Sequence, residues 1–360
     1  MPLKIVHCAD VHLETTFPQT RGGAARRKAL ADAFVRIVDE ALAQDADVLT
    51  IGGDLYESER AGPQTVRFLF EQFARFGKPV FIAPGNHDPH APTSLLARGD
   101  LPENVRVFNE AAWRAYPLAP DVTLFGFGHT PAEPGRPFKG AKFERGGVQI
   151  ALMHGSDEMD CPPNKRATAP FNKEEVVASG ANLLLTGHYH GGYIAKHNKR
   201  PIFAYPGSPE PIKFGEGPVH GALVVTVIYG QIDVKPLPTA RTRLIDASCN
   251  LADVTNENGA FDRIEATLRQ YGANDFVRLE LQGNVAPGTR LDTALMEERF
   301  GATLGSLSVA DGTVAYDYES IAREPTVRGY VVRDLLERGT EGTAALRYAL
   351  AAFDGTDISP

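Results

Sequence analysis

Short apolar runs alternate with amphipathic stretches in the N-terminal part of the chain, and this alternation constrains the fold more than any other feature. The runs KIVHCA, DVLTIGG and PVFIAPG are separated by helical patterns over residues 26–43 and 64–76. Strands that alternate with helices indicate a layered α/β fold. From about Pro92, closely spaced apolar runs such as VTLFGFG and NLLLTGHY follow one another between Gly and Pro turns. Two β-sheets faced by helices would accommodate both parts.

The prolines around KPLPTARTR mark a boundary, and the pattern changes beyond it. A helix near residues 261–271, the strand FVRLELQG, a helix near 291–300 and a strand near 304–309 predict a small α+β domain. Residues 324–353 predict two helices with a break at 338–342. By residue number, we expect a catalytic domain over 1–238, a capping domain over 239–323 and a helical segment over 324–360.

Composition excludes several classes of protein. The first residues are too polar for a signal peptide and no run of about twenty apolar residues follows, so we expect a cytoplasmic protein without a membrane segment. The three cysteines lie far apart without C-x-x-C spacing, which argues against zinc ribbons and a disulfide framework. The net charge of -8 argues against holding nucleic acid by overall electrostatics, although carboxylates gathered around metal ions are locally neutralised.

Five short segments share one pattern, in which an apolar strand ends in a loop that carries His, Asp or Asn beside small residues. They are Ala9-Asp10-Val11-His12, Gly52-Gly53-Asp54, Gly85-Asn86-His87-Asp88, Met153-His154-Gly155 and Gly187-His188-Tyr189-His190. Sites in α/β sheets form at the carboxyl ends of strands. A single histidine at a strand end is more often structural, so the case for a metal site depends on the whole set.

Residue type and spacing both favour metal binding. Asp10 and His12, like His188 and His190, are two apart, and in extended backbone such side chains leave from the same face. Each pair is therefore expected to bind one ion. His7 is three positions before Asp10, so in extended backbone its side chain would leave from the opposite face. We expect it to be packed or to support a ligand from behind. Carboxylate, amide and imidazole ligands without a thiolate favour manganese, iron or zinc, and manganese is the first choice.

The order of the five segments is more specific than any one of them. D-x-H, GD, GNHD, H-G and GHxH, over about residues 3–234, resemble the motif series of the calcineurin-like phosphoesterases. The resemblance implies a four-layer αββα sandwich with two divalent ions, Mn²⁺ first and Mg²⁺, Fe²⁺ or Zn²⁺ as alternatives. The metal ligands that it implies are Asp10, His12, Asp54 and His190 for one ion, and Asp54, Asn86, His154 and His188 for the other.

The resemblance also assigns the catalytic residues His87 and Asp88 of GNHD. With Asp54 bridging the two ions, a water activated between them would attack phosphorus in line. His87 would face the substrate and stabilise or protonate the leaving oxygen. Asp88 would orient His87.

Further segments narrow the branch of the superfamily. Three segments resemble parts of SbcD-type DNA-repair exonucleases: IVHCADVHLETTF, YPGSPE with the following FGE, and FVRLELQG. TVRGYVVRDLLE resembles a segment of a bacterial subgroup of DNA-repair exonucleases that is shorter than standard SbcD. The resemblance implies an exonuclease that can also act as an endonuclease, with a cap that shapes the DNA groove. It also implies that the chain can bind an SMC-like ATPase and can form a homodimer. GGDLYESERAGP does not follow the GDxVDRG pattern of phosphoprotein phosphatases, and Glu57 stands where some archaeal and eukaryotic members have histidine.

Two other functions stay open at this point. A phosphodiesterase for a small nucleotide or another non-DNA diester would keep the same metals without needing a cap. A scaffold subunit of an ATPase complex would be expected to have lost ligands, and none is missing here. Lys165 and Arg166, in a polar loop after His154, are expected either to contact substrate phosphate or to be solvated.

Overall fold

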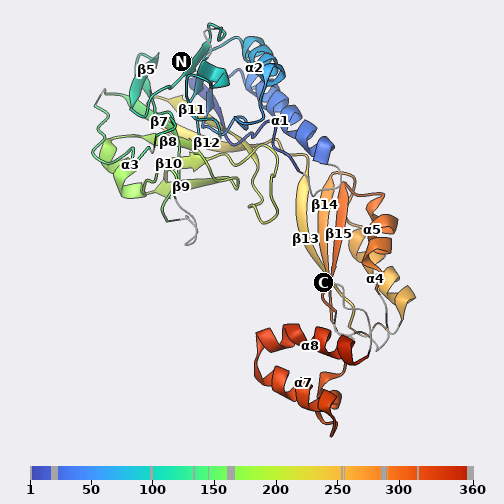
Figure 1. Ribbon diagram of the computed structural model, residues 1–360. Coiled ribbons are helices and arrows are strands. Elements are labelled where there is room, and N and C mark those ends of the chain that lie inside the picture. The colour runs from blue at the N-terminus through green and yellow to red at the C-terminus, as the bar shows by residue number, and fades with distance from the viewer. Residues whose placement is uncertain are drawn as a thin grey trace. The chain divides into compact units, whose positions relative to one another are not determined.

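The structure is a computed structural model, and it divides into two compact units, Met1–Arg243 and Leu244–Pro360 (Figure 1). Each unit is described by itself. The residues that the structure describes are 2–17, 23–97, 100–132, 134–144, 146–159, 167–252, 254, 256–283, 285, 289, 291–313 and 316–354.

The first sheet of the N-terminal unit has the strand order β12-β11-β1-β2-β3-β4. Its strands are β1 (Leu3–Cys8), β2 (Val48–Ile51), β3 (Val80–Ile82), β4 (Val105–Val107), β11 (Gly221–Ile228) and β12 (Gln231–Pro238). β1 to β4 are parallel, and β11 pairs antiparallel with β1 so that Val225 lies opposite Ile5. β1, β2 and β3 therefore end at the same edge of the sheet.

The second sheet has the strand order β5-β6-β7-β8-β10-β9. Its strands are β5 (Arg114–Ala119), β6 (Val122–Gly126), β7 (Val148–His154), β8 (Leu183–Gly187), β9 (Tyr193–His197) and β10 (Arg200–Tyr205). β6, β7, β8 and β10 are parallel, and His154 at the end of β7 lies beside Gly187 at the end of β8. Every residue of β7 is buried, as expected for a strand of a sheet covered on both faces.

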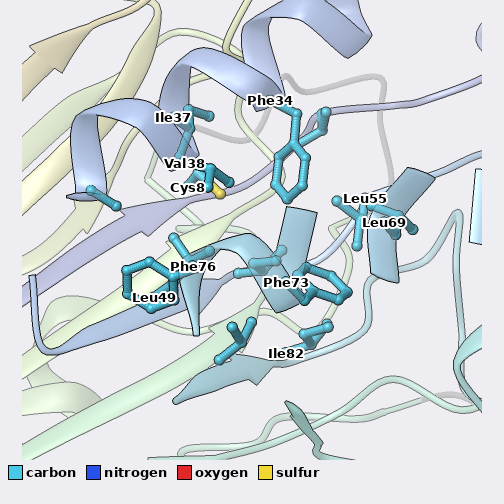
Figure 2. Packing of buried hydrophobic residues seen from close by; sticks show 14 of the residues in the cluster. Cys8, Phe34, Ile37, Val38, Leu49, Leu55, Leu69, Phe73, Phe76 and Ile82 are labelled. Carbon is cyan, nitrogen blue, oxygen red and sulfur yellow. The ribbon is translucent and has the colours of Figure 1, made fainter. Parts of the chain in front are cut away.

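The two sheets pack face to face through apolar side chains from both, including Ile5 and Leu185. The helical elements of this unit are α1 (Gly23–Ala43), α2 (Pro63–Phe76), the 3-10 turn η1 (Leu95–Ala97) and α3 (Lys173–Ser179). Phe34 of α1 and Phe73 of α2 pack edge to face in the core over the first sheet (Figure 2). Val176 of α3 packs in the core on the outer face of the second sheet. The predicted αββα sandwich is confirmed.

The C-terminal unit begins with a three-stranded sheet in the order β13-β14-β15. Its elements are β13 (Arg243–Asn250), α4 (Glu257–Leu268), β14 (Asp275–Gln282), α5 (Thr293–Gly301) and β15 (Ser306–Asp311). Ile264 of α4, Leu279 of β14 and Met296 of α5 share one buried core. The predicted α+β arrangement is confirmed, and β13 is a strand that the sequence patterns did not reveal.

Three more helices follow in this unit, and their bounds are α6 (Tyr318–Ala322), α7 (Val327–Glu337) and α8 (Thr340–Phe353). Ile321, Val332 and Leu346 form a small core of their own. The predicted break between the last two helices falls at Gly339, where φ is 68°, and α6 was not predicted. The domain limits placed after residues 238 and 323 stay predictions. No helix in the described part of the chain combines the length and the apolar character needed to cross a membrane.

His7 on β1 is fully buried, as expected for a packed residue. Its Nε2 lies 3.3 Å from the carbonyl oxygen of Thr186 on β8, and its Nδ1 lies 3.0 Å from Oγ1 of Thr50 on β2. A carbonyl oxygen only accepts, so Nε2 carries the proton and the ring joins the two sheets. Burial lowers the pKa of His7 to about 4, although both hydrogen bonds act in the opposite direction.

The metal-free protein should lose stability as the pH falls from 6.5 towards about 4. In this range the unfolded chain binds a proton at His7 and the folded chain does not, so the stabilisation is complete only above pH 6.5. The effect should be on the order of 3 kcal/mol. His7→Gln keeps a donor and an acceptor but does not titrate, so its unfolding free energy should vary less with pH. Urea unfolding at several pH values tests this, and equal pH dependence in both proteins would contradict it.

Candidate metal centre

The five predicted segments meet at one edge of the two sheets. β1, β2 and β3 of the first sheet and β7 and β8 of the second end there. The Asp10 N–H donates to the carbonyl oxygen of Gly53 at 3.0 Å, and the His12 N–H donates to that of Asp54 at 2.9 Å. The His188 N–H lies 3.0 Å from both carboxylate oxygens of Asp10. Backbone hydrogen bonds thus join the loops of the first sheet, and the Asp10 carboxylate joins them to the second sheet.

Four candidate ligands have backbone conformations that are rare for residues other than glycine. The φ angle is 54° at Asp10, 48° at His12, 50° at Asp54 and 114° at His188. β1 ends at Cys8, so the expectation that Asp10 and His12 lie in extended backbone is wrong. Strained backbone of this kind persists only where the surrounding structure fixes it, and it gathers at functional sites.

Glycines in GGD and GNHD allow the loops to approach closely. A Cβ atom at Gly85 would lie 2.3 Å from Oδ1 of Asp54. One at Gly53, where φ is 87°, would lie 2.7 Å from Nδ1 of His154. A side chain at either position would displace a candidate ligand.

Asp10, His12 and His190 form the first cluster, in which one ligand atom of each lies within 4.8 Å of the others. Nδ1 of His12 is 2.8 Å from Oε1 of Glu57, and Nδ1 of His190 is 2.6 Å from Oε1 of Glu216. Burial alone would raise the pKa of each glutamate, but hydrogen bonds with the histidines outweigh it and lower both pKa values. Both carboxylates are therefore ionised and accept the Nδ1 protons.

Protonation on Nδ1 leaves Nε2 of each imidazole for another partner. Nε2 of His12 is buried and has no hydrogen-bond partner among the residues that the structure describes. It lies 3.6 Å from Oδ2 of Asp54. A buried polar atom without a partner is costly, and a cation between these donors removes the cost. The first cluster therefore fits a divalent ion.

Asp54, His154 and His188 form the second cluster, again within 4.8 Å. Nδ1 of His154 donates to the carbonyl oxygen of Gly52 at 2.8 Å, so Nε2 is the atom that faces the cluster. From Nε2 the distances are 3.1 Å to Oδ1 of Asn86, 3.3 Å to Oδ2 of Asp54 and 3.3 Å to Nδ1 of His188. Four potential electron-pair donors thus point into one volume.

These electron pairs repel one another unless positive charge lies among them. In the absence of a metal, burial would lower the pKa of His154, but the carboxylate of Asp54 outweighs burial and the pKa rises to about 9. Burial lowers the pKa of His188 to about 3, so this ring stays neutral. Oδ2 of Asp54 faces His12 and His154 alike. The donors fit two cations that share Asp54.

The structure corrects the expected use of the GHxH pair. His190 joins Asp10 and His12 in the first cluster, whereas His188 joins the second, so the two histidines do not hold one ion between them. The reason is the turned backbone at His188, where φ is 114°. The family resemblance implied the same division of these two histidines, and its full ligand sets stay predictions.

The role expected for Asp88 is also wrong. Its Oδ1 accepts from the backbone N–H groups of Asp54 (3.1 Å) and Gly85 (2.6 Å), and its Oδ2 accepts from that of Leu55 (2.8 Å). Asp88 therefore holds two ligand loops together. Nδ1 of His87 instead lies 2.9 Å from Oε2 of Glu57.

Three residues of the site were not identified from the sequence as part of it. Glu57 was noted only as a departure from related proteins, and Glu216 only within a resembling segment. His129 was given no role, yet its buried Nε2 lies 2.8 Å from the carbonyl oxygen of His154. No sequence spacing could have identified these three residues, because each contacts a candidate ligand residue that lies far away in the chain.

A cavity of about 780 Å³ opens beside the clusters. Its lining includes Glu57, His87 and residues 212–217. The His87 side chain is 44% exposed, which leaves it accessible to a substrate. Lys165 and Arg166 lie outside the described residues, so a contact between them and substrate phosphate stays a prediction.

Comparison of the sequence with known protein families shows to which family the chain belongs. Residues 3–192, more than half of the chain, match the family of calcineurin-like phosphoesterases, and this range contains every candidate ligand. The chain belongs to this family, whose members are metal-dependent phosphoester hydrolases.

Individual proteins resemble this chain only at low sequence identity. The chain is 26% identical over 303 residues to the uncharacterized metallophosphoesterase YhaO of Bacillus subtilis, with 78% of this chain and 72% of that protein covered. It is 26% identical over 234 residues to the DNA double-strand break repair protein Mre11 of Methanopyrus kandleri, with 59% and 50% covered. The chain thus spans half the length of that archaeal protein.

Among solved structures, TT1561 of Thermus thermophilus is similar at 13% identity and a TM-score of 0.42. The similarity covers 66% of this chain and 99% of that one. A likeness of this extent adds nothing to the family assignment.

We expect two Mn²⁺ ions per chain with Asp54 as their common ligand. Asp54→Asn should weaken both binding steps by about tenfold or more, because a neutral amide replaces the shared charge. Calorimetric titration of metal-free protein measures both steps, with Asp39→Asn on the exposed face of α1 as the matched control. Fewer than two ions in the wild type, or one unaffected step in Asp54→Asn, would contradict the shared ligand.

Proposed function

We propose that the chain is a two-metal nuclease that hydrolyses DNA phosphodiester bonds in DNA repair, as an exonuclease first and an endonuclease in addition. The observation that carries the proposal is the 234-residue match to a DNA double-strand break repair protein. The clusters that share Asp54 supply the hydrolytic site that such an activity needs. Mn²⁺ is the ion proposed for both sites.

The distribution of charge along the chain supports DNA as the substrate. Residues 244–360 contain ten arginines, no lysine and nineteen acidic residues, a net charge of -9. The remaining residues, 1–243, therefore have a net charge of +1, since the whole chain has -8. The unit that contains the clusters has no excess of negative charge to repel DNA phosphates.

The residues of the cavity can act on a bound diester. The ligands of both clusters would hold two divalent ions, which would supply activation of a water and neutralisation of the charge on the phosphate. The backbone N–H of His87 donates to Oδ1 of Asp54 at 2.8 Å, which fixes this residue beside both clusters. Its hydrogen bond with Glu57 raises the pKa of His87 and favours the imidazolium, the form that can donate a proton to the leaving oxygen.

His87→Ala should slow DNA cleavage by about a hundredfold or more, because general acid catalysis contributes at least that factor. It should slow cleavage of bis-p-nitrophenyl phosphate less, because p-nitrophenolate leaves without needing a proton. Both Mn²⁺ ions should stay bound, whereas Asn86→Ala should weaken one. Turnover of both substrates and calorimetric titration test these roles. Loss of metal in His87→Ala, as in Asn86→Ala, would contradict the assignment.

We also propose that residues 244–360 select the substrate and do not hydrolyse it. Every candidate ligand precedes Tyr193, and the charge of -9 makes attraction of phosphates by this unit unfavourable. Selection would then act through shape or through a partner. Exposed Val327, Tyr330 and Tyr348 on α7 and α8 offer apolar contacts for the proposed SMC-like ATPase or for a second copy of the chain.

The purified chain with Mn²⁺ should degrade end-labelled linear duplex DNA and cleave bis-p-nitrophenyl phosphate. A chain that ends at Arg243, the limit of the N-terminal unit, should lose the first activity much more than the second. Asp54→Asn is the control for contaminating nuclease, and bound Mn²⁺ shows that the shortened chain is folded.

Two results would contradict these proposals. Cleavage of the small diester without any cleavage of DNA would favour a phosphodiesterase for small substrates. Equal loss of both activities by a folded shortened chain would remove the C-terminal unit as a selecting element.

A further inference from the structure

The carboxylate of Glu57 lies between two histidines with different proposed tasks. Its Oε1 is 2.8 Å from Nδ1 of His12, and its Oε2 is 2.9 Å from Nδ1 of His87. The two rings meet edge to face with centroids 4.8 Å apart. Thr15 Oγ1 also donates to Oε1 at 2.9 Å, and the Glu57 side chain is only 15% exposed. One carboxylate thus contacts a proposed metal ligand and the proposed acid.

The hydrogen bonds to the Glu57 carboxylate determine which ring nitrogens of His12 and His87 carry protons. A carboxylate has no proton to give, so both histidines must donate their Nδ1–H. Each ring therefore presents Nε2 on its opposite side. For His12 this is the buried atom that has no partner in the described part of the chain. For His87 it is the atom left to meet a leaving oxygen.

The backbone around Glu57 fixes its position relative to both loops. The Glu57 N–H donates to the carbonyl oxygen of Leu13 at 2.9 Å, next to His12 in the chain. The Ser58 N–H donates to the carbonyl oxygen of His87 at 3.1 Å. The main chain and the side chain of this segment thus hold the same two loops, so a small shift of Glu57 would move both rings.

We propose that Glu57 is a positioning residue that keeps Nδ1 of both His12 and His87 protonated and fixes the orientation of both rings. It thereby couples the holding of an ion to the transfer of a proton. The inference rests on the proposed roles of these two histidines but not on DNA as the substrate. The atoms of His12, Glu57 and His87 also lie close enough to hold a cation of their own. Since both Nδ1 atoms are already hydrogen bonded to the carboxylate, we assign no ion there.

Glu57→Gln is the informative substitution because it keeps size and changes the donor pattern. The amide has one accepting oxygen and one donating NH₂ group, so it can satisfy the Nδ1–H of one histidine only. The other ring meets a donor and must turn or change its tautomer. Glu59→Gln, two residues away and exposed, removes the same charge and is the matched control.

Two measurements are needed: the affinity for each Mn²⁺ ion and the turnover rate at saturating Mn²⁺. Calorimetric titration of metal-free Glu57→Gln should show one of two Mn²⁺ steps weakened by about 10-fold to 100-fold, the usual effect of losing a partner that orients a ligand. Turnover of diphenyl phosphate, whose leaving group needs a proton more than p-nitrophenolate does, should fall by a similar factor even at saturating Mn²⁺. Glu59→Gln should match the wild type in both. In a His87→Ala background, Glu57→Gln should no longer change the saturated rate by more than about twofold.

Several results would overturn the proposal. A rate that recovers fully at saturating Mn²⁺ would mean that Glu57 acts on His12 alone. A rate loss that persists in the His87→Ala background would mean that it does not act through His87. A third Mn²⁺ in the wild type that is lost in Glu57→Gln would make Glu57 a ligand. Failure of the DNA proposal shows separately, as cleavage of diphenyl phosphate by a wild type that leaves DNA intact.

A measurement on the unmodified chain does not depend on the folding of any variant. Long-range ¹H–¹⁵N spectra of histidine-labelled protein loaded with diamagnetic Zn²⁺ report which ring nitrogens carry protons. His12 and His87 should both have a protonated Nδ1. An unprotonated Nδ1 on either ring would overturn the proposal.

Discussion

The buried carboxylate of Asp54 is the group on which the rest of the site depends. A carboxylate removed from water is costly unless donors and cations surround it, and Asp54 is only 2% exposed. Its Oδ1 accepts the His87 N–H, and its Oδ2 faces His12 and His154 from the two clusters. Gly85 has no side chain that would collide with Oδ1 of Asp54. Asp88 accepts hydrogen bonds from the backbone N–H groups of Asp54 and Gly85 and so holds their loops together.

Sequence patterns predicted the parts of the molecule that repeat a local rule. Buried strands and amphipathic helices have a period, so the sandwich and the approximate bounds of its two long helices could be predicted. The five ligand segments could be predicted because each ends a strand. The division of His188 and His190 between clusters could not be inferred from spacing, because it depends on a positive φ at a residue other than glycine. The contact of Glu216 with His190 could not be inferred because no spacing rule joins residues 26 positions apart in the chain.

The net charge of the whole chain conceals an uneven division of charge along the sequence. Averaged over the chain, -8 argues against a nucleic-acid ligand, but residues 244–360 alone account for -9. Repulsion from exposed charges is screened within about 10 Å at ordinary salt, so it acts where the charges are. The net charge of +1 on residues 1–243 does not itself oppose a polyanion at the clusters. The charge of -9 on residues 244–360 is unfavourable for contact between those residues and phosphates.

The groups that orient the ligands lie outside the motifs that supply them. Nδ1 of His12 is held by Glu57, that of His190 by Glu216, and that of His154 by the carbonyl oxygen of Gly52. Only the last of these belongs to a ligand motif. Imidazole can bind an ion through either nitrogen, so the motif fixes the type of ligand and the outer acceptor fixes which atom is offered. Chains with identical motifs can therefore differ in metal affinity, and the difference resides at positions such as 57 and 216.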